Sequence, residues 1–291
     1  MKPPLNYVVI TPVRNEENNF PHTVESFINQ TIRPALWIIV DDGSTDRTAA
    51  ITDEAAAKYD WIRVVHRADR GFRQPGTGVV AAFNDGLALV GTRSWDYLVK
   101  FDGDLSFAPD YFEQCFAKFD AEPTLGIGGG LICSAISQGT VGESLGDPLF
   151  HVRGATKIYR HACWQQIGGL FKAPGWDTLD ELKANMLGWT TRTFRDLKVH
   201  QLKETGSADG KWRNWVKNGL ANYITGYHPV FMGAKCVKRI AGRPYIIGAA
   251  GLAWGFAKGY LTRTPQVPDP ALIKYVRSQQ MRKLTGRPCI W

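Results

Sequence analysis

Short apolar runs alternate with amphipathic segments along the first part of the chain. Three continuous runs rich in β-branched residues, Tyr7–Val13, Leu36–Val40 and Ile62–Val65, are typical of strands buried on both faces of a parallel sheet. Two segments with helical spacing of apolar residues, His22–Ile28 and Arg47–Lys58, lie between them. This β-α-β-α-β opening predicts an α/β fold with a doubly wound, mostly parallel sheet flanked by helices.

The alternation continues to about residue 187 and then changes to a purely helical pattern. Further strands are predicted over Trp95–Val99, Leu125–Ile132 and Val152–Arg160, and further helices over Gly78–Leu89, Tyr111–Phe119, His161–Ile167, Leu182–Leu187, Leu220–Tyr227, Tyr245–Leu261 and Ala271–Leu284. We therefore expect a nucleotide-binding and catalytic α/β domain over residues 1–205, and a helical C-terminal region over 206–291 that covers the acceptor side.

Polar loops follow the first three predicted strands. Arg14–Asn19 follows the first, Asp41–Asp46 the second, and the basic segment His66–Arg73 the third. Ligands of such sheets bind outside the carboxyl ends of the strands, so we expect these loops to line one site. The basic segment is placed for a phosphate or a base to pass, although a solvated surface loop would have the same composition.

Two carboxylates end the strand predicted over Trp95–Val99. Asp102 and Asp104 are separated by Gly103, and carboxylate oxygens beside a phosphate are what a divalent cation prefers. Asp and Gly also form solvated turns, which is the alternative interpretation of the same three residues. The context of the other strand ends favours the metal site.

A second acidic group lies near the start of a later predicted helix. Asp177, Asp180 and Glu181 follow Trp176. Carboxylates at helix N-termini are common as caps, but a cap needs only one side chain. An apolar wall such as Trp176 excludes water and favours proton abstraction by one of these carboxylates.

Composition and charge narrow the class of partner. The 291 residues are 44% hydrophobic and 21% charged, as in ordinary globular proteins, and the net charge of +8 favours anionic partners. No run of Lys and Arg resembles a nucleic-acid arm, so we expect small phosphates or lipid head groups and no nucleic acid. Five widely spaced cysteines without metal-ligand spacing, and an N-terminus without an apolar leader, predict a cytoplasmic protein.

The segment Tyr245–Leu261 is apolar, rich in glycine and shorter than the roughly 20 residues of a bilayer crossing. Basic residues flank it on both sides, namely Lys235, Lys238, Arg239, Arg243, Lys258 and Arg263. Two interpretations stay open. A helix in the membrane interface would give peripheral contact through residues 235–263 on the cytoplasmic face, whereas a core helix would pack through its small residues.

Taken in order, Val9–Glu17, Ile39–Asp46 and Asp102-Gly103-Asp104 resemble the family 2 glycosyltransferases, inverting sugar-nucleotide enzymes of the GT-A fold. The resemblance covers roughly residues 6 to 200. Trp176-Asp177, with Gly188-Trp189 further on, looks like the family's acidic base motif and the Gly-aromatic pair that ends its helix. On this register Asp177 takes the base position, although Trp176 stands where many members carry Glu, and Asp180 is close enough to remain an alternative base.

The resemblance implies a nucleoside-diphosphate sugar as donor, with UDP as the default nucleotide, a hydroxyl of a glycan or lipid-linked molecule as acceptor, and Mg²⁺ or Mn²⁺ as cofactor. It implies cell-surface polysaccharide or glycolipid assembly as the setting. At the donor it places Thr11, Pro12, Arg14, Glu16, Asp42, Arg67, Arg70, Asp102 and Gly103, and at the metal Asp104 and Asp102.

The chemistry agrees with these roles. A divalent cation neutralises the leaving diphosphate, a carboxylate base deprotonates the acceptor, and no second carboxylate is needed as a nucleophile, which predicts a single displacement with inversion. The segment Gly210–Gly219 lacks the Gln of processive members, so we expect limited addition. The alternatives are a sugar-1-phosphate nucleotidyltransferase, whose opening is richer in Gly and Arg, and an inactive sugar-nucleotide or membrane-binding module.

Overall fold

The computed structural model describes residues 5–72, 76–136, 140–143, 147–203, 210–240 and 245–291. Within-chain contacts divide the chain into two compact units. The first unit comprises Met1–Gly169 and Leu187–Glu204, and the second comprises Leu170–Met186 and Thr205–Trp291. The segment that contains Asp177 and Asp180 therefore belongs to the second unit, although strands of the first unit precede and follow it in the sequence.

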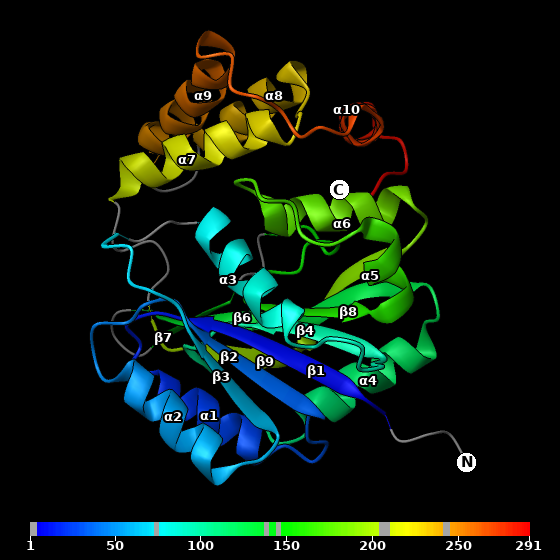
Figure 1. Ribbon diagram of the computed structural model, residues 1–291. Helices are drawn as coiled ribbons and strands as arrows, with labels where there is room; N and C mark the ends of the chain where they lie inside the picture. The colour runs from blue at the N-terminus through cyan, green and yellow to red at the C-terminus, as the bar shows by residue number, and fades with distance from the viewer. Residues whose placement is uncertain (1–4, 73–75, 137–139, 144–146, 204–209, 241–244) are drawn as a thin grey trace. The chain divides into compact units, whose positions relative to one another are not determined.

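The first unit is built on a nine-stranded sheet with the order β3-β2-β1-β4-β8-β6-β9-β5, and β7 pairs with β6 (Figure 1). The strands are β1 (Tyr7–Val13), β2 (Leu36–Asp41), β3 (Ile62–His66), β4 (Tyr97–Phe101), β5 (Leu105–Phe107), β6 (Leu125–Ile136), β7 (Thr140–Glu143), β8 (Thr156–Arg160) and β9 (Thr190–Gln201). The predicted α/β sheet flanked by helices is confirmed.

Strand direction changes across this sheet. The neighbours β3, β2, β1 and β4 are parallel, as their continuous apolar runs predicted. Beyond β4 the sheet is mixed, because β8 runs antiparallel to both β4 and β6, while β9 runs parallel to β6. The parallel half therefore brings the carboxyl ends of β1, β2, β3 and β4 to one edge.

Helices cover both faces of the sheet. They are α1 (Phe20–Ile28), α2 (Thr48–Lys58), α3 (Thr77–Ala88), α4 (Tyr111–Ala121) and α5 (His161–Ile167). In Figure 1, α3 lies on the opposite side of the sheet from α1 and α2. Gly86 of α3 approaches the side chains of Ile10 and Val40, whereas Tyr7 and Trp37, each three residues earlier in the same strand, belong to the aromatic core on the other face.

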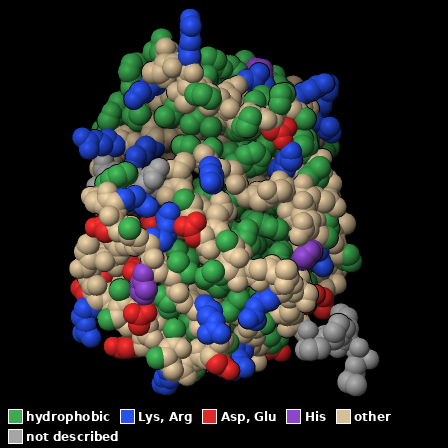
Figure 2. Space-filling view, viewed as in Figure 1, with side chains coloured by type: hydrophobic (Ala, Val, Ile, Leu, Met, Phe, Trp, Pro, Cys, Tyr) green, Lys and Arg blue, Asp and Glu red, His purple; other side chains and the backbone are tan. Residues whose placement is uncertain are grey.

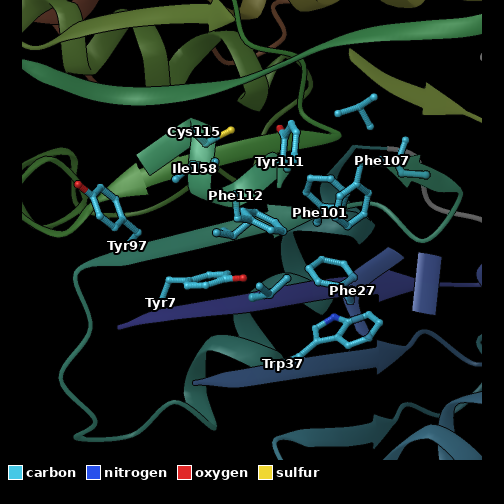
Figure 3. Packing of buried hydrophobic residues seen from close by; sticks show 14 of the residues in the cluster. Tyr7, Phe27, Trp37, Tyr97, Phe101, Phe107, Tyr111, Phe112, Cys115 and Ile158 are labelled. Carbon is cyan, nitrogen blue, oxygen red and sulfur yellow. The ribbon is translucent and has the colours of Figure 1, made fainter. Parts of the chain in front are cut away.

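Aromatic side chains from α1 and α4 bury one face of β1 and β2. Phe27 of α1 lies over Trp37 with ring centroids 4.3 Å apart, and Tyr7 lies 5.0 Å from Phe112 of α4 (Figure 3). Because these rings are fully buried, truncating Phe27 to Ala would cost about 3–5 kcal/mol. Strands fixed on both faces leave their C-terminal loops as the part of the sheet that is open to ligands.

The second unit is helical in its described parts, with α6 (Trp176–Met186), α7 (Lys211–Ile224), α8 (Pro229–Ile240), α9 (Tyr245–Leu261) and α10 (Pro270–Leu284). Asp269 caps α10 by accepting a hydrogen bond from the Leu272 amide at 3.0 Å and also pairs with Lys183 of α6. Helix α7 begins nine residues before the predicted start at Leu220, since the basic and aromatic segment Lys211–Gly219 forms its first turns. Helix α8 was not predicted.

Candidate active site

The loops that follow β1, β2 and β3 are bound to one another. Asn15 has a left-handed backbone, with φ 53°. Its side-chain oxygen accepts a hydrogen bond from the Thr45 backbone amide at 2.8 Å, and its backbone amide donates to the Ser44 hydroxyl at 3.0 Å. The amide of Arg67 donates to the carbonyl of Asp41 at 2.8 Å. The ends of the three parallel strands therefore form one connected surface.

A glycine permits the closest approach within this surface. Gly43 has φ 73°, and a Cβ added to it would lie 2.6 Å from the Cα of Asp69. Both the left-handed conformation and the contact exclude a larger residue. Gly43 thus allows the basic segment after β3 to cross directly over the Asp41–Asp46 loop.

Arginines gather around Asp42. The buried Asp42 carboxylate accepts hydrogen bonds from the guanidinium groups of Arg67 and Arg70, with Arg70 Nη1 to Asp42 Oδ1 at 2.9 Å. Arg14 donates to the Asp42 carbonyl oxygen and, at 2.7 Å, to Asp69. The cluster combines a carboxylate acceptor with fork-shaped cations, which are suited to polar base edges and to phosphates.

The two carboxylates beyond β4, Asp102 and Asp104, lie in different environments. Asp104 is buried, and its pKa rises to about 6 because of that burial and because of the nearby charge of Asp102, with a smaller contribution from Glu16. Gln201 opposes this shift by donating a hydrogen bond to Asp104 at 3.1 Å. Lys100, a buried lysine of β4, pairs with Asp102.

These carboxylates fit a cation that also takes ligands from the substrate. Within the described part of the chain, no group of three His, Cys, Asp or Glu side chains is arranged to hold a metal ion. Mg²⁺ and similar ions, however, are often held by one or two carboxylates together with water and substrate phosphates. The pKa of Asp104 is raised first by burial and then by the charge of Asp102, so a cation held by Asp102 and Asp104 would stabilise the ionised form of this carboxyl.

Three of the predicted donor residues shape the backbone. Thr11 is fully buried, and its hydroxyl accepts a hydrogen bond from the indole of Trp37 at 2.9 Å. Pro12 lies in the β1 ladder opposite Val40. A Cβ added to Gly103 would lie 2.4 Å from Cγ1 of Val13, so glycine is needed where the end of β4 passes β1. Among the predicted residues, the polar side chains at this edge are those of Arg14, Glu16, Asp42, Arg67, Arg70, Asp102 and Asp104.

Four residues at this edge were not singled out from the sequence. Lys100 could have been predicted from the sequence, because residues two apart in a strand lie on the same face and Asp102 comes two residues after Lys100. Gln201 and Lys203 come from the distant end of β9, and Lys203 pairs with Glu16 at 2.7 Å. His66 bonds to Asp41 at 3.0 Å and to Asp53, and these hydrogen bonds raise its pKa.

The candidate bases lie in α6 of the second unit. Asp177 is in the first turn and half-buried, whereas Asp180 and Glu181 are completely buried. The carboxylate of Asp180 accepts a hydrogen bond from the Glu181 amide at 2.7 Å. Burial raises the pKa of Tyr227, and the charges of Glu181 and Asp177 add to that shift. Of the three carboxylates, Asp177 is therefore the accessible one.

Comparison with known proteins identifies the sheet and its loops. Residues 8–142 match the model of the family described as "Glycosyl transferase family 2". The polyprenol monophosphomannose synthase of Mycolicibacterium smegmatis is 33% identical over 129 residues, which are 44% of this chain and 46% of that protein. Glycosyltransferase GlyG of Streptococcus pneumoniae is 24% identical over 206 residues, covering 70% and 60% respectively. The chain thus spans less than two thirds of the length of these relatives.

Solved structures agree on the fold. The mannosyltransferase PcManGT from Pyrobaculum calidifontis, in complex with GDP-Man and Mn²⁺, superposes with a TM-score of 0.58 at 16% identity over 94% of this chain and 79% of that one. S. aureus TarS 1–349 in complex with UDP-GlcNAc gives a TM-score of 0.55 at 16% identity over 96% and 81%. The fold is the GT-A fold, and the stretch that is similar to glycosyl transferase family 2 is residues 8–142 of this chain.

Proposed function

We propose that the protein is an inverting glycosyltransferase that moves a hexosyl group from a nucleoside-diphosphate sugar to a hydroxyl of a glycan or lipid-linked acceptor. The observation that carries this proposal is the acidic pair at the end of β4, the buried Asp104 and the partly exposed Asp102, in a chain whose residues 8–142 match the family 2 model. The setting we propose is cell-surface polysaccharide or glycolipid assembly, which the name of the M. smegmatis relative supports.

The donor would be held by the Asp42 cluster. Asp42 accepts an N–H of the base, and Arg67 or Arg70, which bind Asp42 in the free protein, turn toward base carbonyls or the diphosphate. Uracil presents one N–H between two carbonyls, which matches a carboxylate between two guanidinium groups, so UDP is our preferred nucleotide. Thr11, Pro12 and Gly103 keep the strand ends close beneath it.

The leaving group is stabilised at the acidic pair. Asp104 and Asp102 would hold Mg²⁺ or Mn²⁺, and such an ion would supply positive charge beside the leaving diphosphate. Lys100 keeps the Asp102 carboxylate in place, and Gln201 orients that of Asp104. Mn²⁺ in the PcManGT complex supports the choice of a divalent ion for this chain.

Asp177 would act as the general base. Its exposure and its place in the first turn of α6, where the helix dipole favours a carboxylate, suit a group that must reach an acceptor hydroxyl and be ionised beforehand. Asp180 is the alternative, but it is buried. Because one base suffices, the sugar is transferred in a single displacement with inversion at the anomeric carbon.

We also propose that the protein acts in the cytoplasm, in contact with the cytoplasmic face of a membrane through residues 235–263. In the part of the chain that the structure describes, none of the helices combines the length and the apolar character needed to cross a bilayer. The contact that we propose is peripheral, and it suits a lipid-linked acceptor whose sugar is added at the membrane surface.

A donor-binding experiment tests the first step. Thermal unfolding is followed with UDP, GDP and dTDP, each with and without Mn²⁺, and UDP with Mn²⁺ is expected to raise Tm by about 2 °C or more. Stabilisation by GDP alone would reassign the base. No stabilisation by any of the three, or release of pyrophosphate from a nucleoside triphosphate and a sugar 1-phosphate, would contradict a glycosyltransferase.

A matched pair of variants tests the base. Asp177→Asn is expected to lower transfer by about 10²- to 10⁴-fold with donor binding unchanged, because only the proton acceptor is lost. Asp180→Asn, the control, should keep most of the activity. The reverse result would move the base to Asp180, and retention of the anomeric configuration, measured by NMR of the product, would contradict the single displacement.

A further inference from the structure

Helix α9 packs on α7 through its glycines. A Cβ added to Gly255 would lie 2.0 Å from the carbonyl oxygen of Val216, and one added to Gly219 of α7 would lie 2.2 Å from that of Leu252. A Cβ added to Gly259 would lie 2.2 Å from the ring of Tyr223. The inner face of α9 is therefore its small-residue face, which lets the two helices lie in close contact.

Leu252 and Phe256 of α9 are buried, but several other large apolar side chains of this helix point the other way. Ile246, Trp254 and Leu261 are 70%, 51% and 71% exposed, and Ile247 is exposed as well. Exposed alanines at positions 250, 253 and 257 complete the spacing, so these residues form one continuous helical stripe, which we call the α9 stripe. A helix that faces water usually has polar residues on its outer face, so an outward stripe of large apolar side chains in addition to the buried Leu252 and Phe256 is unusual.

The neighbouring helix shows the same orientation. Val230 and Val237 of α8, one heptad apart, are among the most exposed large apolar side chains of the second unit, and Met232 is the buried residue of this helix. Helices α8 and α9 contact each other. Apolar exposure in this unit is therefore a property of two adjacent helices, beyond what scattered surface residues would give.

The positive charge around the α9 stripe indicates an anionic partner. Between Gly210 and Pro268 the sequence has nine Lys and Arg residues and no Asp or Glu. Lys258 lies on the exposed side of α9, and Arg263 follows the end of the helix. In Figure 2, hydrophobic side chains gather over the unit that contains α7, α8 and α9, with Lys and Arg around them and few acidic side chains.

We infer that the α9 stripe lies flat in the interface of an anionic lipid bilayer. Apolar side chains would enter the boundary between head groups and acyl chains, and the surrounding cations would meet lipid phosphates. The 17 residues of α9 are too few to cross a bilayer, which leaves the in-plane orientation. The inference concerns attachment at residue level and does not depend on the proposed glycosyl transfer, because binding is measured without a donor.

Co-sedimentation of the full chain with vesicles tests the inference. The protein is expected to pellet with vesicles of equal POPC and POPG and to remain largely in the supernatant with POPC alone. The triple variant Ile246→Ser, Trp254→Ser and Leu261→Ser should lower partitioning onto the mixed vesicles by about tenfold or more. Its control is Leu89→Ser with Leu149→Ser, which removes exposed leucines from the first unit and should bind as the wild type does.

A charge pair separates lipid phosphates from purely apolar adsorption. Lys238→Glu with Lys258→Glu should weaken binding by about tenfold or more, whereas Lys58→Glu with Arg63→Glu, which makes the same change in net charge on the first unit, should not. Added salt should likewise release the wild type. Wild-type protein that stays in the supernatant with mixed vesicles, or a triple variant that pellets normally, would overturn the inference. A vesicle-free dimer that the triple variant dissociates would assign the stripe to a second copy of this chain instead.

Discussion

At the scale of single residues, Asp104 has the most unusual environment in the described acidic site. Its pKa of about 6 lies above the usual value near 4, so the folded state prefers the protonated carboxyl and ionisation near neutral pH costs folding free energy. A stabilising residue would have the opposite shift. The cost is understandable if this carboxylate is kept for a cation, which repays it when bound.

Asp104→Asn is therefore expected to stabilise the metal-free protein while it inactivates it. Removing the charge should add about 1–3 kcal/mol to the free energy of unfolding at pH 7.5, and only a few tenths at pH 4, where the folded-state carboxyl is protonated and the unfolded one is roughly half ionised. Sugar transfer with Mn²⁺ should fall by at least about 10²-fold. Urea unfolding at both pH values and a transfer assay measure the two effects.

The control for this variant is Asp102→Asn. Asp102 is partly exposed and paired with Lys100, so neutralising it should give no comparable gain in stability. Equal stabilisation by both variants would assign the effect to general charge repulsion at this edge. A destabilised Asp104→Asn protein would contradict the idea that the ionised Asp104 is strained.

His66 gives a second pH dependence, of the opposite sign. Hydrogen bonds to Asp41 and then Asp53 raise its pKa, so the imidazolium stabilises the fold below about pH 6.5, and this contribution is lost as pH rises through the raised pKa. His66→Gln should cost up to about 1 kcal/mol at pH 6.0 and almost nothing at pH 9.0, since the side chain is nearly half exposed. Thermal unfolding across this range measures it, and an equal cost at both pH values would show that charge is not involved.

At the scale of elements, the loops around Asp42 depend on one close backbone contact. Gly43→Ala should destabilise the protein by about 2 kcal/mol or more, because a methyl group at φ 73° is strained and would also collide with Asp69. Since the Arg67 and Arg70 segment is then displaced, nucleotide affinity should fall as well. Urea unfolding and nucleotide titration follow the two effects.

Gly91→Ala is the matched control. Gly91 also has a positive φ, of 59°, but nothing lies within 4 Å of an added Cβ, so only the backbone strain of about 1 kcal/mol is expected. The difference between the two variants isolates the collision with Asp69. If they lose the same stability and Gly43→Ala binds nucleotide normally, the contact between the two loops is unimportant.

The elements predicted from the sequence were those whose burial leaves a periodic trace. Strands β1 and β2 are buried on both faces and read as continuous apolar runs. Strand β9 was missed because its alternation is broken where the pairing with β6 shifts register between Phe194 and Lys198, and because its partners β5 and β6 are distant in sequence. Helix α8 was not predicted although it is amphipathic, and what the sequence could not show is that Val230 and Val237 on its apolar side are exposed.

The same reasons explain what could be predicted of the candidate site. Asp42, Asp102 and Asp104 stand at strand ends within recognisable motifs, which local sequence is enough to identify. Gln201 approaches Asp104 only because β9 pairs with β5, a long-range contact that periodicity cannot supply. For α9 the sequence left two interpretations open, and the structure gives the helix both a packed glycine face and an exposed apolar face.

At the scale of the whole molecule, the two proposed tasks belong to different compact units. The donor residues are in the first unit, and the α9 stripe is in the second together with Asp177. Residues 170–186, which contain the candidate bases, are an excursion from the first unit between α5 and β9. Donor binding and membrane attachment should therefore be separable by mutation, with the base residue positioned by the unit that contains the stripe.

Hydrogen exchange of the full chain tests this separation. UDP with Mn²⁺ is expected to slow exchange in residues 41–46, 66–72 and 100–105, because these loops would be ordered by the ligand, and to leave α9 unchanged. Vesicles of equal POPC and POPG should slow exchange in α9 and leave those loops unchanged. The Ile246→Ser, Trp254→Ser and Leu261→Ser variant should keep the first response and lose the second. Protection of α9 by nucleotide alone would mean that the units are coupled, and attachment to a membrane would then regulate donor binding, since such coupling acts equally in both directions.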